Sequence, residues 1–564
     1  MAIEEIVKQL FTDDFETVEQ GLEAFQNTYT TYDEVIECFN ALAGQENEWF
    51  NQETLEWFFG DIERSDFRYY IVIWFLGYFA SFPENKEKVE EYTSLQMHRL
   101  GWHKLPPTMR YFTGLQNLGL ARHGLRELPD WIGELTELRE LHLWENELTS
   151  LPESIGNLKK LEKLDLSSNE LEALPESIGN LESLREISIG ANVVTSLPEP
   201  IGNWSNLTRL SLGTNNLERL PKSLQNLGSL KTLDLIKNGL SEWSEQDLND
   251  AFETIGKLPV LKELYIGDNG LQTIPEGVCN LTELKTLSVR WNPLKNLPES
   301  MVKMVSLETV SFEEAPLNLS EEEAQPFFQR LAALPCLKTL NLNETGLSIL
   351  PQSFGLLKTL EFLYIENNKI VSFSENASGL EGLKLISLNT NHFGEMTEEE
   401  VEQLFSTISL IPNLETLWAG ITRWPNKGTL KKLPDSIGDC KNLKKLKIEN
   451  QDITTLPESI GNLSQLEYLE LEANRLTSLP QSLSKLARLK GLKLGKNKLS
   501  VHAEEEIQQL IQALSFEDDE VDPEDFNASF FKALPRFVRL YGNDFSKEAE
   551  ERLKEALPKI DIEI

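Results

Sequence analysis

The chain has 564 residues, of which 40% are hydrophobic, and its 53 basic and 91 acidic side chains give a formal net charge of −38. A chain this acidic repels phosphate backbones and anionic membranes, so we expect neither nucleic acid nor a membrane among its partners. The charge favours a protein partner with a basic face. The alternative is that the acidic residues only solvate the surface.

The compartment is predicted from targeting signals and cysteines. The first residues lack the basic and apolar regions of a signal peptide, and the most apolar stretch, 69–82, is too short to span a bilayer. The four cysteines, Cys38, Cys279, Cys336 and Cys440, lie far apart and show no zinc spacing. We therefore expect a cytoplasmic monomer without metal or cofactor.

In chain order, residues 1–104 contain no repeat, and their apolar residues recur at helical spacing, as in Ile3, Ile6, Val7 and Leu10. They predict a small all-α N-terminal domain with an aromatic-rich core. The simplest role for such a domain is to cover the open hydrophobic edge of the domain that follows, since the terminal units of a repeat array need caps.

Residues 105–564 are dominated by an internal repeat. Sixteen copies of Leu-x-x-Leu-x-Leu-x-x-Asn-x-Leu run from Leu115 to Leu499, and eleven of the fifteen intervals between them are 23 residues. A fixed period of this length predicts a solenoid, in which each repeat packs only on its neighbours.

Each repeat predicts one turn of that solenoid. Leu-x-Leu alternates with period two and should form a short strand whose leucines face the core. The Asn, present in eleven of sixteen copies, should bond the backbone of its own and the next repeat, and His123 takes its place in the first copy. The following Leu-Pro half should return as a short helical turn, so that the stack curves with its strands on the concave side.

Insertions interrupt the regular period. Amphipathic helices are expected near 244–257, 320–333, 397–410 and 503–514, and a C-terminal capping helix and strand near 546–564. Ser320 with Glu323, and Thr397 with Glu400, fit capping boxes. Residues 418–432, which include Trp424, predict a protruding loop, and 516–526 predict an acidic solvated insertion.

The repeats resemble the typical 23-residue leucine-rich repeats, mixed with longer ones similar to those of ribonuclease inhibitor. The combination resembles cytosolic bacterial leucine-rich repeat proteins and plant intracellular Ras-group-related ones. The resemblance implies an α/β solenoid: a curved, right-handed horseshoe with a parallel concave β-sheet and short helices on the convex side. It also implies protein–protein recognition through the concave face.

Outward strand positions are the candidate binding surface, because a rigid sheet displays them side by side. Large aromatic and arginine side chains there are typical of interaction hot spots. The alternative is that the rings only pack on neighbouring strands. The candidate residues are His142, Trp144, Tyr265, Arg290, Trp291, Phe362, Tyr364, Trp418 and Tyr468.

No catalytic constellation is present: the sequence has no phosphate-binding loop, and its six histidines are scattered. The expected function is a non-enzymatic scaffold or signalling adaptor that binds a protein on the concave face. One alternative is an effector or inhibitor that caps a basic enzyme. A more remote one is an enzyme with an unrecognised N-terminal activity, for which Cys38 is the only nucleophilic thiol outside the repeats.

Overall fold

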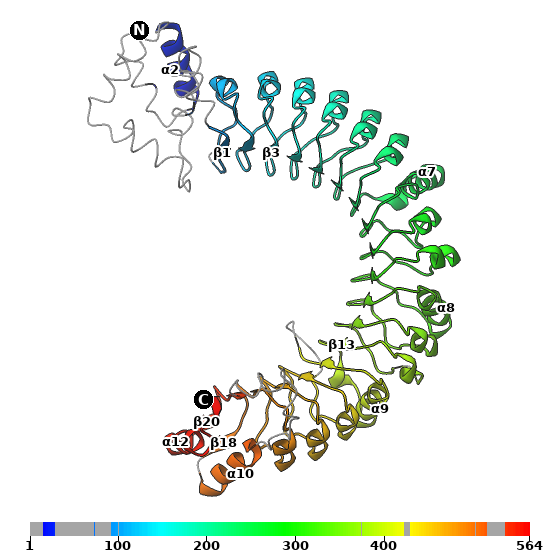
Figure 1. Cartoon of the computed structure of the whole chain (residues 1–564), viewed down its shortest axis with the longest axis vertical. Coiled ribbons are helices and arrows are strands. Elements are labelled where there is room, and N and C mark those ends of the chain that lie inside the picture. The colour runs from blue at the N-terminus through cyan, green and yellow to red at the C-terminus, as the bar shows by residue number, and fades with distance from the viewer. Residues whose placement is uncertain are drawn as a thin grey trace, which may run out of the picture. The chain divides into compact units, whose positions relative to one another are not determined.

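A computed structural model describes residues 9, 15–28, 73, 92–99, 101–373, 375–421, 429–501, 503–515 and 536–564 (Figure 1). Most of the expected N-terminal domain, Trp424 and the acidic insertion therefore lie outside the described residues. The chain divides into two compact units, Met1–Asn269 and Gly270–Ile564. The boundary expected at residue 104 remains a prediction.

The first unit contains one run of parallel strands, each paired with the next. They are β1 (Ser94–Gln96), β2 (Asn117–Gly119), β3 (Glu140–His142), β4 (Lys163–Asp165), β5 (Glu186–Ser188), β6 (Arg209–Ser211), β7 (Thr232–Asp234) and β8 (Glu263–Tyr265). Strand β1 lies ahead of the first repeat recognised in the sequence, so pairing begins earlier than the motif indicates.

The second unit contains a second run of parallel strands, again paired in succession. They are β9 (Thr286–Ser288), β10 (Thr309–Ser311), β11 (Thr339–Asn341), β12 (Phe362–Tyr364), β13 (Leu385–Ser387), β14 (Thr416–Trp418), β15 (Lys445–Lys447), β16 (Tyr468–Glu470), β17 (Gly491–Lys493), β19 (Arg536–Arg539) and β21 (Ile560–Glu563). The short strands β18 (Ser500–Val501) and β20 (Asp544–Phe545) pair separately. The predicted α/β solenoid is thus confirmed.

Helices return the chain on the side opposite the strands in each unit (Figure 1). Among the described residues, α2 (Phe15–Thr28) precedes the strands. The longer helices that follow are α7 (Glu245–Ile255), α8 (Glu321–Ala332), α9 (Glu398–Ser409), α10 (Glu504–Leu514) and α12 (Lys547–Ala556). Both predicted capping boxes are confirmed, Ser320 with Glu323 on α8 and Thr397 with Glu400 on α9. Each box satisfies two backbone groups at a helix N-terminus that would otherwise have no partner.

Most repeats without an inserted helix return through five-residue 3-10 turns, such as η4 (Glu153–Asn157) and η5 (Glu176–Asn180). Pro175, in the β region, precedes η5 at its N-cap. The Glu153 carboxylate accepts a 3.1 Å hydrogen bond from the Ser177 backbone N–H, so one turn caps the next. A Cβ on Gly156 would lie 2.5 Å from the Ser177 carbonyl oxygen, which explains the glycine between Ile and Asn.

The regularly spaced Asn residues form a ladder of hydrogen bonds through the core. Asn169 Nδ2 donates to the carbonyl oxygens of Leu166 and Leu143, both at 2.9 Å, and its Oδ1 accepts from Leu148 N–H at 3.1 Å. The side chain therefore bonds its own and the preceding repeat, and the prediction that it bonds the following repeat is wrong. Each Asn pairs backbone groups that burial would otherwise leave without hydrogen bonds.

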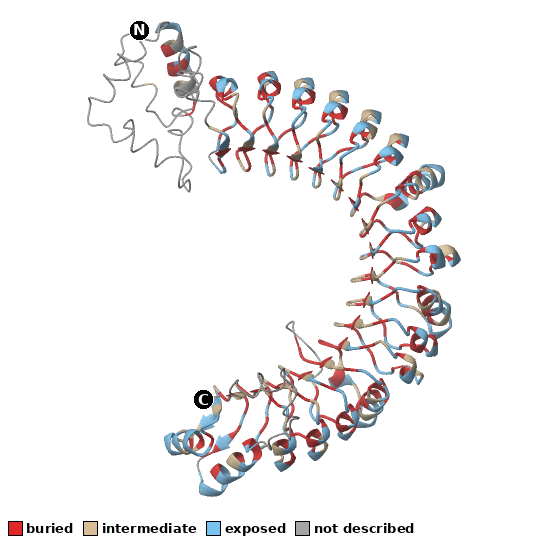
Figure 2. Cartoon of the chain, viewed as in Figure 1, coloured by how far each residue is buried: buried red, intermediate tan, exposed pale blue. Residues whose placement is uncertain are grey.

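Buried leucines fill the interior between the strands and the helical turns of each unit (Figure 2). Leu141, Leu287 and Leu446, the central residues of β3, β9 and β15, are all 0% exposed. The side chains on either side of each central leucine point outward, so the register fixes which residues a partner could touch.

His123 gives a pH-dependent prediction for the first unit. Its ring packs against Trp102, its Nε2 lies 2.9 Å from the Met97 carbonyl oxygen, and its Nδ1 makes no hydrogen bond to any described residue. Burial lowers the pKa of this imidazole from 6.5 to about 4. Between pH 6.5 and pH 4 the imidazole is protonated in the unfolded chain but stays neutral in the folded chain. The free energy of unfolding therefore falls as the pH drops through this range.

We therefore expect His123→Asn to remove about 2 kcal/mol of the loss in unfolding free energy between pH 7 and pH 5. Urea unfolding of wild type and variant at both pH values measures this difference. The carboxylates contribute equally to the pH dependence of both proteins, so their contribution cancels in the comparison. Identical pH dependence in the two proteins would contradict the buried, neutral imidazole.

Candidate functional site

The strand face of each unit is the surface formed by the third, fifth, seventh and eighth positions of its repeats, counted from the first leucine. In β3, the central Leu141 is buried while Glu140 and His142 are half-buried. The eighth position follows the strand and adopts a left-handed backbone in most repeats, as at Glu145 with φ 54°. All nine residues predicted from the sequence lie on these strand faces.

In the first unit, His142 and Trp144 belong to a cluster around Arg122. The Arg122 guanidinium carbon lies 4.6 Å from the centre of the Trp144 ring, and two hydrogen bonds of 2.6 and 2.7 Å join Arg122 to Glu145. The His98 ring lies 6.3 Å from Trp144. Burial, and then the charges of His142 and Arg122, lower the pKa of His98. The cation–π contact restrains the half-buried indole against the guanidinium.

Tyr265 is the last residue of β8, and its side chain points outward on the same face as that of Glu263. Its hydroxyl donates to Glu263 Oε2 at 3.2 Å, and Thr232 Oγ1 donates to the same oxygen at 3.2 Å. Burial, followed by the nearby Glu263 carboxylate, raises the pKa of the Tyr265 hydroxyl. The ring is thus fixed and uncharged, as a rigid binding anchor requires.

Arg290 and Trp291 follow β9 in the second unit. The guanidinium carbon of Arg290 lies 4.5 Å from the centre of the Trp291 ring, which is 38% exposed. Trp291 has φ 56° and is the only aromatic side chain among the described residues with a left-handed backbone. That conformation costs a bulky residue about 1–2 kcal/mol. The repeat imposes it, since the same position is left-handed in most other repeats.

The aromatic patch of the second unit comes from β12, β13 and β14. Tyr364 pairs with Ser387, and Ser387 with Trp418, so two large rings flank a serine that is fully buried despite its outward position. The indole Nε1 of Trp418 is buried and makes no hydrogen bond to any described residue. Phe362 pairs with Leu385 on the same strands, which places apolar side chains together at positions normally left to polar ones.

Tyr468 lies in a cluster that the sequence analysis recognised only in part. Its ring centre is 6.5 Å from that of Phe537 on β19 and 5.9 Å from Lys445 Nζ. Gly491 lies between them and leaves room for both rings, since a Cβ there would lie 2.3 Å from Phe537. Strand β19 was not recognised as a repeat, yet Asn543 after it bonds the Leu494 carbonyl oxygen as a ladder Asn does. The ladder spacing was the signal that could have revealed it.

A charged ladder runs along the edge of the strands, at the second position of the repeats. Arg139 pairs with Glu162, Lys285 with Glu308, Lys384 with Glu361, Lys444 with Glu415 and Lys490 with Glu467. The members of each pair come from neighbouring repeats. Exposed pairs of this kind contribute little stability individually, but they hold charge at the edge, away from the strand face.

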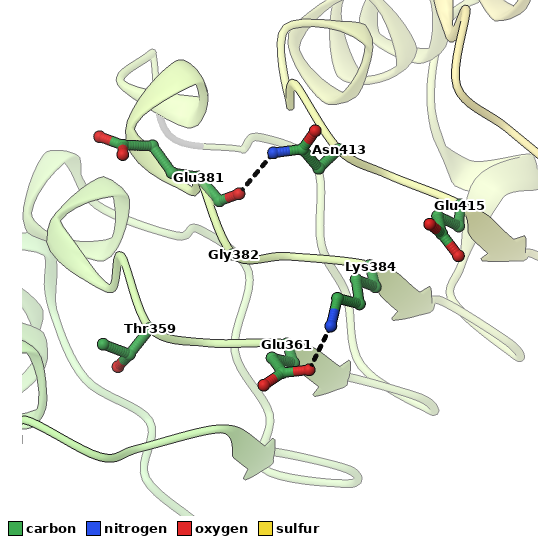
Figure 3. Close-up of a pocket in the computed structure, with 7 residues that line it drawn as sticks. All are labelled: Thr359, Glu361, Glu381, Gly382, Lys384, Asn413 and Glu415. Atoms are coloured by element: carbon green, nitrogen blue, oxygen red, sulfur yellow. Dashed lines mark hydrogen bonds and ion pairs between the residues drawn. The ribbon is translucent and has the colours of Figure 1, made fainter.

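The ladder also lines an open hollow of about 350 Å³ beside β12 to β14 (Figure 3). Lys384 points to Glu361, with 2.6 Å between Nζ and Oε2, and Asn413 donates to the Glu381 carbonyl oxygen at 2.8 Å. Most of the lining residues carry polar or charged side chains, and several of these already have partners. None of the nine candidates lines it, and the hollow has no apolar wall suited to a small organic ligand.

Other kinds of site find no support in the described ranges. They contain no group of three or more His, Cys, Asp or Glu arranged to hold a metal ion. None of their helices combines the length and the apolar composition that a bilayer crossing requires. The three cysteines described, Cys279, Cys336 and Cys440, form no disulfide bond, and burial raises the pKa of Cys440 to about 12. A thiol with so high a pKa is a poor nucleophile.

The comparisons with known families agree with this geometry. A leucine-rich repeat region family matches residues 130–266, and a leucine-rich repeat family matches residues 441–499. Comparison with curated proteins gives no match.

Two solved structures illustrate the likeness. A leucine-rich repeat protein of Leptospira interrogans is 28% identical, with 85% of this chain and 98% of that chain covered and a TM-score of 0.52. A chain of the Toll–Spatzle complex from Drosophila is 16% identical, with a TM-score of 0.53. That match covers 80% of this chain but only 58% of the other, and it shows the fold alone.

The parallel strands, the Asn ladder and the short return helices define a solenoid with an exposed strand face. With the family matches, they identify the chain as a leucine-rich repeat protein. Leucine-rich repeat domains generally mediate protein–protein interaction and are typically non-enzymatic.

Proposed function

We propose that this protein is a non-enzymatic interaction scaffold or signalling adaptor that binds a protein partner through its strand face. The observation that carries the proposal is the aromatic patch of Phe362 and Tyr364 on β12 and Trp418 on β14, which flank β13. Fixed rings at outward positions lose little conformational entropy on binding, so they suit hot spots.

The net charge of −38 supports a partner with a basic face, and together with the four scattered cysteines it supports a cytoplasmic monomer. The acidity also disfavours nucleic acid and anionic membrane as partners. None of the histidines among the described residues hydrogen-bonds to a serine or a cysteine, which favours a scaffold over an enzyme.

An inhibitor that caps a basic enzyme is the second candidate, favoured only by the acidity. The two functions differ in salt dependence. An inhibitor held mainly by charge should lose affinity steeply as the ionic strength rises, whereas binding through aromatic anchors should change little.

Affinity capture from native-host lysate with mass spectrometry tests the proposal. We expect a protein captured by wild type to be lost from a variant in which Tyr265, Trp291, Tyr364 and Trp418 are all alanine, since truncating a hot spot costs about 2 kcal/mol or more. Circular dichroism must first show that the variant folds. A partner retained equally by both proteins would place binding elsewhere on the molecule.

A further inference from the structure

The strand face of the last repeats has a charge pattern unlike that of the chain as a whole. Five cations stand at outward positions on and after β15, β17 and β19, in a chain of net charge −38. We call this set the basic strip; it consists of Lys445, Lys447, Lys493, Lys496 and Arg539.

The strip is organised around one buried carboxylate. Glu470 on β16 has a side chain only 8% exposed, and Lys445, Lys447 and Lys493 lie 3.1, 3.5 and 3.7 Å from its oxygens. Burial alone would raise the pKa of Glu470, but these lysines, Lys445 foremost, hold it below its ordinary value. One anion thus gathers three ammonium groups on neighbouring strands, each still about one third exposed.

Aromatic rings fix the remaining cations and add apolar surface. Lys496 Nζ lies 5.9 Å from the centre of the Tyr541 ring, and the Arg539 guanidinium carbon lies 5.1 Å from that of Phe537. Beside them, Tyr468 and Phe537 lie together over Gly491. The surface combines cations with half-buried rings, the composition that hot spots favour.

The carboxylates on this face already have partners. Lys447 pairs with Glu449 at 3.0 Å, the Tyr541 hydroxyl donates to Glu472 at 2.7 Å, and Arg539 binds both Asp561 and Glu563. Each lysine ammonium has three N–H donors and no acceptor. Lys445 contacts one carboxylate and Lys447 two, and Lys493 lies 3.7 Å from its nearest one. Five carboxylates lie among these five cations, and each already has a partner, so the lysines keep N–H donors for an added anionic ligand.

We propose that the basic strip binds an acidic segment of a protein partner, with Asp or Glu carboxylates on the lysines and an apolar side chain against Tyr468 and Phe537. This rests on the proposed function of the strand face and names the chemistry recognised at one end of it. The acidity of the rest of the chain does not prevent this contact, because charges more than about 8 Å away are largely screened at physiological salt.

Fluorescence anisotropy of a short labelled peptide of repeating Glu-Glu-Tyr, with a Gln-Gln-Tyr peptide for comparison, tests the proposal on the full chain. The variant is Lys447→Gln with Lys493→Gln. The matched control is Lys444→Gln with Lys490→Gln, which removes the same charge from the same strands but at the edge ladder, where each lysine pairs with a glutamate at 2.9 Å. A Lys447→Arg, Lys493→Arg variant keeps the charge.

We expect wild type to bind the Glu peptide and not the Gln peptide. The strip variant should bind about tenfold or more weakly, while the edge control and the arginine variant should stay within about threefold of wild type. Equal losses in strip and edge variants would overturn the proposal, as would no binding by wild type, or tighter binding of an RNA oligonucleotide or of phosphatidylserine vesicles than of the peptide.

This result is separable from that of the lysate capture. A partner lost on removing the four aromatic anchors, together with failure of the peptide to bind, would sink the acidic-segment proposal and leave the proposed function standing. A partner unaffected by the aromatic changes would sink the proposed function, whatever the peptide does.

Discussion

Replacing Leu287 by alanine is expected to lower the free energy of unfolding by about 2–5 kcal/mol. Leu287 is the central residue of β9, is 0% exposed and pairs with Val310 of β10. The truncation removes apolar contacts and leaves a cavity that the neighbouring strands cannot close without losing register. Because each repeat supports its neighbours, the loss should be transmitted to the adjacent interfaces.

Urea unfolding followed by circular dichroism measures this change. Leu410→Ala is the matched control, since Leu410 is 53% exposed and the same truncation there should shift stability by less than about 0.5 kcal/mol. If both variants unfolded at the same urea concentration as wild type, the assignment of Leu287 to the core would be wrong.

The second large effect is expected at the Asn ladder. Asn391 is 0% exposed, donates to the carbonyl oxygens of Leu388 and Ile365 at 2.8 and 3.0 Å, and accepts from Ile370 N–H at 3.2 Å. Alanine would leave these three backbone groups buried without that partner. Since each such group costs about 1–3 kcal/mol, we expect a loss of about 2–4 kcal/mol after partial relaxation.

Asn413→Ala provides the comparison, because the exposed Asn413 makes one hydrogen bond, to the Glu381 carbonyl oxygen at 2.8 Å. Its loss should cost less than about 1 kcal/mol. Thermal or urea unfolding of both variants distinguishes the sites, and equal costs at Asn391 and Asn413 would show that the ladder contributes no special stability.

The repeat architecture could be predicted from the sequence because each repeat specifies its own local structure. Leu164 and Leu166 alternate as a strand requires, and Asn169 falls where the chain turns inside the core. The capping boxes at Ser320 and Thr397 are equally local, since their partners lie three residues away. Patterns of this kind need no knowledge of the neighbouring repeats.

Other features depend on register and could be predicted only in part. Arg122 and Glu145 lie one period apart, so their ion pair follows from the spacing, but the Arg122 contact with Trp144 also needs the rotamers of both side chains. Strand β1 was missed because Tyr92 replaces the first leucine of its motif and Leu100 replaces the Asn, although Leu95 and Met97 remain. The predicted direction of the Asn ladder was wrong because the motif does not indicate whether the amide bonds the preceding or the following repeat.

The central claim is that partners bind the strand face, and the affinity of a captured partner tests it most directly. Isothermal titration should compare wild type with two fourfold alanine variants, one lacking Tyr265, Trp291, Tyr364 and Trp418, the other lacking Val302, Val305, Leu356 and Leu410, which are exposed apolar residues on the helical side. Our account predicts a loss of about 100-fold or more for the first and less than about threefold for the second. The reverse result would place the binding surface on the helical side and contradict the account.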